Sequence, residues 1–244
     1  MQLLIGSTTT FQINDGGYKH QNTGFCIYYF QWSRVFANNS TVELNNSSST
    51  GPSSVTFGNL IINFTTDPGA VVNSSGGITT INGNLTIQNT STREFRLTGN
   101  TAVTTTIAKD LVISGGTFNV ASGSGAPTLN VGGNFNQSGG TLTSTGSLTS
   151  IVFTGSGKTF TQSAGTLTST NINWAVNNGA SLTLINNLPV ATTRTVAING
   201  TLDCSTLAIS GAGTVVVNNG GTIKLDLPTV PGQLLEIYLQ AGLH

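Results

Sequence analysis

Short runs in which apolar and polar residues alternate recur along most of this chain. Leu85-Thr86-Ile87, Leu111-Val112-Ile113 and Leu182-Thr183-Leu184 each place apolar side chains two positions apart. Clusters of Gly, Ser and Asn, such as Ser138-Gly139-Gly140, separate these runs. A period of two is typical of a β-strand with one buried face, and Gly and Asn supply the backbone angles of tight corners. The pattern predicts two or three short strands between successive corners.

A three-residue motif, here called the repeated phrase, returns at a fixed interval and gives these strands a common period. Two of its copies are Gly58-Asn59-Leu60 and Gly83-Asn84-Leu85. Its apolar third residue recurs every 24 to 26 positions, as Leu60, Leu85, Leu111, Phe135 and Phe160. Because one such unit cannot bury its own apolar face, a fixed period is typical of stacked repeats. We therefore predict an all-β fold: a single-stranded parallel β-helix, or β-solenoid, with coils of about 25 residues. Roughly six to seven coils would stack with about 4.8 Å between equivalent strands.

The residue before this apolar position forms a polar column along the predicted stack. Its members are Asn59, Asn84, Asp110, Asn134 and Thr159. Stacked Asn side chains at a corner can bond one another and the corner backbone, as amide ladders do in cross-β stacks. We expect Asp110 and Thr159, which depart from Asn, to break this ladder.

Three zones differ in composition. Residues 1–57 are irregular, and the segment from Tyr18 to Phe36 holds seven of the seventeen aromatic residues. We expect an aromatic-rich N-terminal cap with irregular first coils over 1–57, and the repeat array over 58–224. Residues 225–244 are expected to form a C-terminal tail or cap, with a short helix over 232–244. An uncapped end would expose an unpaired strand edge, which favours edge-to-edge self-association.

Several phrases in the array carry a resemblance to a known class of proteins. Gly83-Asn84-Leu85-Thr86-Ile87 and Asn199-Gly200-Thr201-Leu202-Asp203 resemble the β-strand repeats of large bacterial secreted surface proteins, which include adhesin-like and autotransporter-passenger-like chains. The resemblance covers about 58–224. It implies export, display at the cell surface, and attachment to glycans, to matrix or to a neighbouring cell. Two parts of the chain do not resemble these repeats: the aromatic-rich segment near the N-terminus and the Pro-containing C-terminal tail.

The composition of the chain limits the kinds of partner that the protein can bind. Only 7% of residues are charged, the net charge is zero, and the eight Lys and Arg form no basic patch, which excludes an ordinary nucleic-acid interface. No apolar stretch reaches the roughly 18 residues of a membrane-spanning helix. The N-terminus lacks the basic start and the length of a signal peptide. A secreted or cell-surface location therefore requires this chain to be a fragment or a leaderless form.

Residues suited to metal or nucleophilic chemistry are scarce. Cys26 and Cys204 are 178 positions apart, so we expect two unpaired thiols. Of the two histidines, His244 is the last residue, which makes His20 the one candidate for a Ser-His-Asp device. His20 lies in the aromatic segment, where a lone histidine is more often a surface or cap residue.

The densest charged group in the chain consists of Asp67, Arg93, Glu94 and Arg96. Counted from the repeated phrase, Asp67 falls nine positions into its coil, and the other three fall ten to thirteen positions into the next. We expect them side by side on one outer face. Two nearby acids can serve as acid and base in catalysis, or as oxygen ligands for calcium. The simpler interpretation is a surface salt bridge, which stabilises little.

Two functions from different classes follow. The first is a structural, adhesive surface protein that presents long Thr, Ser and Asn faces to glycans, matrix or cell surfaces and needs no cofactor. The second is a β-helix hydrolase or lyase that acts on a polysaccharide or a small ester-type molecule, with calcium as its one candidate cofactor. Its site would use Asp67, Arg93, Glu94 and Arg96, with Asp67 and Glu94 as the calcium ligands, or would lie around His20 instead.

A carbohydrate-binding module without catalysis is the third hypothesis. It requires a row of exposed aromatic side chains. Trp174 is one aromatic residue of the array, but it shares the alternation of Ile172 and Val176, so we predict that it is buried with them.

Overall fold

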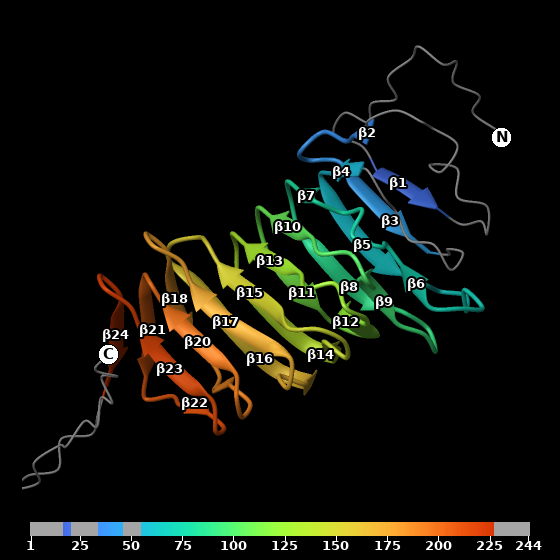
Figure 1. The fold of residues 1–244 in the computed structure, drawn as a ribbon. Helices are drawn as coiled ribbons and strands as arrows, with labels where there is room; N and C mark the ends of the chain where they lie inside the picture. The colour runs from blue at the N-terminus through green and yellow to red at the C-terminus, as the bar shows by residue number, and fades with distance from the viewer. Residues whose placement is uncertain (1–16, 21–33, 46–54, 227–244) are drawn as a thin grey trace, which may run out of the picture.

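The computed structural model of the protein describes residues 17–20, 34–45 and 55–226, with side chains from Phe36 onward (Figure 1). These ranges contain 24 strands and no helix. Every strand pairs with its neighbours in parallel, and each pair joins strands from successive coils. The predicted fold, a parallel β-solenoid, is therefore confirmed.

Two long sheets run along the stack (Figure 1). Sheet A follows the order β1 (Gly17–His20), β3 (Thr41–Leu44), β5 (Asn59–Asn63), β8 (Leu85–Asn89), β11 (Leu111–Ile113), β14 (Phe135–Thr143), β16 (Lys158–Leu167), β18 (Ser181–Leu184), β21 (Thr201–Ser205) and β24 (Thr222–Leu225). A side branch joins it at β14 and consists of β6 (Val72–Asn73), β9 (Phe95–Thr98) and β12 (Thr117–Ala121).

Sheet B faces sheet A across the interior and has nine strands. Its order is β2 (Arg34–Val35), β4 (Val55–Phe57), β7 (Thr80–Ile81), β10 (Thr104–Ile107), β13 (Thr128–Val131), β15 (Thr149–Phe153), β17 (Ile172–Val176), β20 (Thr195–Ile198) and β23 (Thr214–Val217). A small third sheet pairs β19 (Leu188–Pro189) with β22 (Ile209–Ser210).

The repeated phrase sets the register of sheet A. Its apolar third residues stand opposite one another in successive strands, as Leu60, Leu85, Leu111, Phe135 and Phe160. Each is at most 1% exposed. A fixed period in the sequence thus becomes a continuous apolar column in the core.

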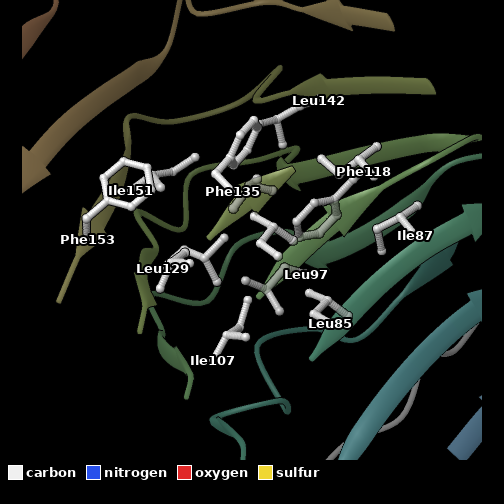
Figure 2. Close-up of a cluster of buried hydrophobic side chains, with 14 of the residues drawn as sticks. Leu85, Ile87, Leu97, Ile107, Phe118, Leu129, Phe135, Leu142, Ile151 and Phe153 are labelled. Atoms are coloured by element: carbon white, nitrogen blue, oxygen red, sulfur yellow. The ribbon is translucent and has the colours of Figure 1, made fainter. Parts of the chain in front are cut away.

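The interior between the sheets is filled by such columns. Side chains from both sheets converge on a common core, which Figure 2 shows for one stretch of the stack. Trp174 is 1% exposed, as predicted; its ring stacks on Phe153 at 6.2 Å and presents an edge to Phe160 at 5.7 Å. Its indole Nε1 donates to the carbonyl of Pro189 at 3.1 Å. Trp174 therefore contributes to the core and offers no platform for a sugar ring.

The polar column forms a ladder in which each side chain bonds the corner backbone of the next coil. The Oδ1 of Asn59 accepts the backbone N–H of Asn84, and Asn84 accepts that of Asp110 in the same way. Asp110 Oδ1 accepts the N–H of Asn134 at 2.7 Å, and Asn134 accepts that of Thr159. The expectation that Asp110 breaks the ladder was wrong, because each rung needs only a side-chain oxygen and a carboxylate supplies one.

This ladder makes a prediction for Asp110. Asp110→Asn keeps an acceptor and is expected to change the free energy of unfolding by less than about 0.5 kcal/mol. Asp110→Ala leaves the Asn134 N–H without its partner and is expected to cost about 1–3 kcal/mol. Denaturant unfolding of both variants measures the difference. Equal losses of unfolding free energy in the two variants would show that the negative charge at this position stabilises the fold and that the hydrogen-bond acceptor does not.

The described ends extend the same two sheets beyond the predicted array. β3 pairs with β5 and β4 pairs with β7, so the solenoid begins before residue 58. Phe36, from the aromatic segment, is buried and stacks on Phe57 at 5.8 Å. The other aromatics of that segment, and the expected helix at 232–244, lie outside the residues whose side chains the structure describes.

Candidate functional site

Three residues of the predicted charged cluster lie at turns beside the side branch of sheet A, and the fourth, Arg96, lies in strand β9 of that branch. Asp67 falls in the loop between β5 and β6, and Arg93 falls one coil later, between β8 and β9. The turn before Arg93 is built by its own side chains: Asn89 Oδ1 accepts the N–H of Ser91, and Thr90 Oγ1 donates to the carbonyl of Arg93. Stacking of the coils then places Arg93 over Asp67.

Asp67 and Arg93 form a salt bridge between neighbouring coils. Arg93 Nε lies 3.0 Å from Asp67 Oδ1, and both side chains are 40% exposed. The N–H of Gly69 donates to the same oxygen, and Thr92 Oγ1 donates to Oδ2 at 2.8 Å. Both oxygens of the carboxylate therefore already accept hydrogen bonds.

These bonds hold Asp67 in its charged form. The side-chain hydrogen bond from Arg93 lowers the pKa of Asp67 most, the Gly69 N–H and Thr92 add to it, and the pKa falls from 3.8 to about 2. Hydrogen bonds that favour the ionised form act in this direction. A group with so low a pKa is a weak base and is not protonated at neutral pH, so it is poorly suited to general acid–base work.

We expect an NMR titration of the Asp67 carboxyl to give a midpoint near 2, as against 3.8 for an unperturbed group. Because the folded-state pKa is depressed, the bonds at Asp67 contribute stability above pH 3.8, and this contribution is lost as the pH falls towards 2. Arg93→Ala removes the largest cause and is expected to raise the midpoint. If the titration midpoint of Asp67 does not move in Arg93→Ala, Arg93 is not the main cause of the lowered pKa.

Glu94 and Arg96 form the second ion pair of the cluster, within one coil. Asn119, which is fully buried in β12, donates to Glu94 Oε2 at 3.1 Å. The same amide donates to Thr145 Oγ1 at 2.7 Å and accepts the Thr145 N–H. One buried side chain thus ties three successive coils together through Glu94, Asn119 and Thr145.

The structure divides the four predicted residues into two ion pairs, Asp67 with Arg93 and Glu94 with Arg96. Each of the four carboxylate oxygens accepts a bond from the protein, so a calcium ion would have to displace existing partners. Over the ranges given above, no three His, Cys, Asp or Glu gather as metal ligands. Catalysis and calcium binding at this cluster stay predictions.

The structure describes the other candidates only in part. His20 ends β1 opposite Leu44, and only its backbone is described. Cys204 is a free thiol in the core, and burial, followed by the charge of Asp203, raises its pKa to about 11. Such a thiol is inert at neutral pH. Cys26 lies outside the described residues.

A broader candidate surface is the outer face of sheet B. One outward column runs along eight strands in register, as Thr56, Thr80, Thr106, Asn130, Val152, Ala175, Ala197 and Val216. A second column runs beside it, as Thr104, Thr128, Ser150, Asn173, Thr195 and Thr214. Strands β4 to β23 of this sheet contain no charged residue.

This face is rigid as well as neutral. Its side chains are short, and the alternate residues of the same strands, such as Leu129 and Ile151, are fully buried. Asn173 Oδ1 accepts the N–H of Thr195, and Asn130 Nδ2 contacts Thr106 Oγ1, so some side chains are held across strands. The outer face of sheet A differs, because it carries Glu43, Asp203 and Lys224.

Comparisons of this chain with models of protein families, with curated proteins and with solved structures give no match. Of the parts that the structure describes, none forms a helix long and apolar enough to span a membrane.

Proposed function

We propose that the protein is a structural, adhesive scaffold that acts outside the cell or at a bacterial cell surface. Its contact surface is the outer face of sheet B, which binds an uncharged, hydroxyl-rich partner such as a glycan or a matrix component. The observation that carries the proposal is the charge-free, in-register face of strands β4 to β23.

Neutrality and rigidity both favour such a partner. A neutral glycan offers hydroxyl groups, which hydrogen-bond to Thr, Ser and Asn side chains but gain nothing from a charged surface. Because the sheet holds these side chains in place before binding, little conformational entropy is lost when contacts form. Each contact is weak, but equivalent contacts repeat along successive strands and add up when one long partner spans them.

A pull-down with insoluble neutral polysaccharides tests the proposal. The unmodified chain is expected to bind, and Thr106→Lys combined with Asn130→Lys is expected to reduce binding at least about tenfold, since two desolvated charges oppose contact. The matched control is Thr86→Lys with Asn136→Lys, which places the same charges on the outer face of sheet A. The proposal fails if the two double variants lose binding equally, or if the unmodified chain binds no member of the panel.

A further inference from the structure

Three corners within the stack, before β23, contain an Asn that is followed directly by Gly. In such a pair, the backbone nitrogen of Gly can attack the side-chain amide carbon of Asn, because Gly has no side chain to hinder the approach. The Asn residues are Asn82, Asn178 and Asn199. Each corner joins a strand of sheet B to the following strand of sheet A. The three pairs share one local sequence, so any difference between them comes from the fold.

Two of these corners are short, and the backbone ladder holds their Gly. The N–H of Gly83 donates to the carbonyl of Gly58 at 2.6 Å, and the N–H of Gly200 donates to that of Val176 at 3.1 Å. Both glycines are buried. A Cβ on Gly200 would lie 2.3 Å from the carbonyl oxygen of Asn177, so the coils are in close contact there. Attack by either nitrogen therefore requires that its bond break and the corner open first.

The third corner, between β17 and β18, is longer and its Gly is free. Residues 177–180 form a turn that is closed by the N–H of Ala180, which donates to the carbonyl of Asn177 at 3.0 Å. Asn178 and Gly179 are the central pair of this turn, and both are exposed. Among the residues that the structure describes, neither the Asn178 side chain nor the Gly179 N–H has a hydrogen-bond partner.

Space around this turn also differs from that at the other two corners. Gly179 has a φ of +77°, and a Cβ there would meet nothing within 4 Å. Asn199 occupies the same corner one coil later, where two residues take the place of four, and its Oδ1 accepts Asn218 Nδ2 at 2.7 Å. Asn178 can therefore change its conformation without disturbing a neighbouring coil, whereas Asn199 cannot.

We propose that Asn178 is a site of spontaneous deamidation in the folded protein. The Gly179 nitrogen loses its proton to solvent and forms a bond to Asn178 Cγ. The bond from Cγ to the side-chain nitrogen breaks, and that nitrogen takes up a proton and leaves as ammonia. Water then opens the resulting succinimide ring at one of its two carbonyls and leaves aspartate or isoaspartate at this position. Water is the one further reactant.

The reaction adds a negative charge to a chain whose net charge is zero. The new carboxylate stands at the end of β17, beside the outer face of sheet B, whose strands from β4 to β23 carry no charged residue. The bond that closes the turn uses backbone atoms of Ala180 and Asn177 only, so we expect the coils to stay stacked when aspartate forms. The inference rests on this corner and is independent of the proposed function.

Site-resolved mass spectrometry of the full chain, aged at mildly alkaline pH, tests the inference. In the folded chain, Asn178 is expected to deamidate at least about tenfold faster than Asn82 and Asn199, because their glycine nitrogens must first leave the ladder. In denaturant, the three residues are expected to react at similar rates. Asn178→Gln, whose longer side chain would have to close a larger ring, is expected to end deamidation at this position and to leave the rates at the other two unchanged.

Three results would overturn the inference. Equal rates at Asn178 and Asn199 in the folded chain would show that the longer corner is no more reactive than the short one. Reaction of Asn178 in denaturant alone would show that the folded turn protects it. Equally fast reaction in Asn178→Gln would show that the Gly179 nitrogen is not the attacking group. Amide exchange in the central strand β13 reports whether the aged chain keeps its fold.

Discussion

Trp174→Ala is expected to lower the free energy of unfolding by about 3–5 kcal/mol, the range for removing a large aromatic side chain from a core. Trp174 is the largest fully buried side chain among the described residues. Its ring touches aromatic side chains from both sheets, with Phe153 at 6.2 Å, Phe160 at 5.7 Å and Phe135 at 6.1 Å. Its removal would leave a cavity that three rigid rings cannot fill.

The matched control is Val152→Ala, which shortens an outward side chain on the adjacent strand β15. It is expected to change the free energy of unfolding by less than about 1 kcal/mol, because no core cavity forms. Trp174→Phe keeps most of the ring but loses the bond to Pro189, so an intermediate loss is expected. Denaturant unfolding monitored by circular dichroism compares the three. A loss in Trp174→Ala as small as that in Val152→Ala would contradict the described core.

Gly165→Ala is expected to cost about 3 kcal/mol or more, because it combines backbone strain with a clash between coils. Gly165 has a φ of +83°, and a Cβ there would lie 2.4 Å from the carbonyl oxygen of Gly139 in the preceding coil. Backbone atoms cannot move aside as a flexible side chain does. The two coils would have to separate at this corner, which would weaken the pairing of β14 with β16.

Gly179→Ala is the control that separates the two effects. Gly179 has a similar φ of +77°, but a Cβ there meets nothing within 4 Å. Only the strain of the left-handed conformation remains, with an expected cost of about 1–2 kcal/mol. Thermal unfolding measures both variants. Equal destabilisation would mean that the close approach of the coils at Gly165 contributes nothing.

The period of the sequence predicted the stacking but not the chemistry of each side chain. The interval of the repeated phrase predicted which residues stand opposite one another, since register follows directly from a fixed coil length. Asp110 was misjudged because a ladder of Asn side chains was taken to need an amide at every position. The structure uses an oxygen acceptor for the next backbone N–H, a role that Asp fills as well as Asn.

At the candidate site, too, the period predicted which residues are stacked but not what each side chain bonds. Spacing predicted that Asp67 and Arg93 meet between coils, and they do. It missed Asn119, although Glu94, Asn119 and Thr145 follow one another at 25 and 26 residues, which is the period already recognised. Periodicity shows which positions are stacked. It does not show which polar side chain turns inward, because that depends on local packing at the side branch.

The adhesive and the enzymatic functions differ in what they require of the carboxylates. A hydrolase or lyase needs an acid and a base with free lone pairs and adjusted pKa values. In the structure, Asp67 has a lowered pKa and both of its oxygens are bonded, and Glu94 is held by Arg96 and Asn119. An adhesive scaffold needs neither property and uses a different surface.

The most direct test is an activity and binding screen of the purified chain against mixed polysaccharides and small esters, with calcium and with a chelator. The account predicts binding without turnover in both conditions. It also predicts that Glu94→Gln and Asp67→Asn leave binding unchanged, while Thr106→Lys with Asn130→Lys reduces it. Turnover that is abolished by Glu94→Gln or Asp67→Asn, with the fold intact, would contradict the scaffold and place an active site at the charged turns.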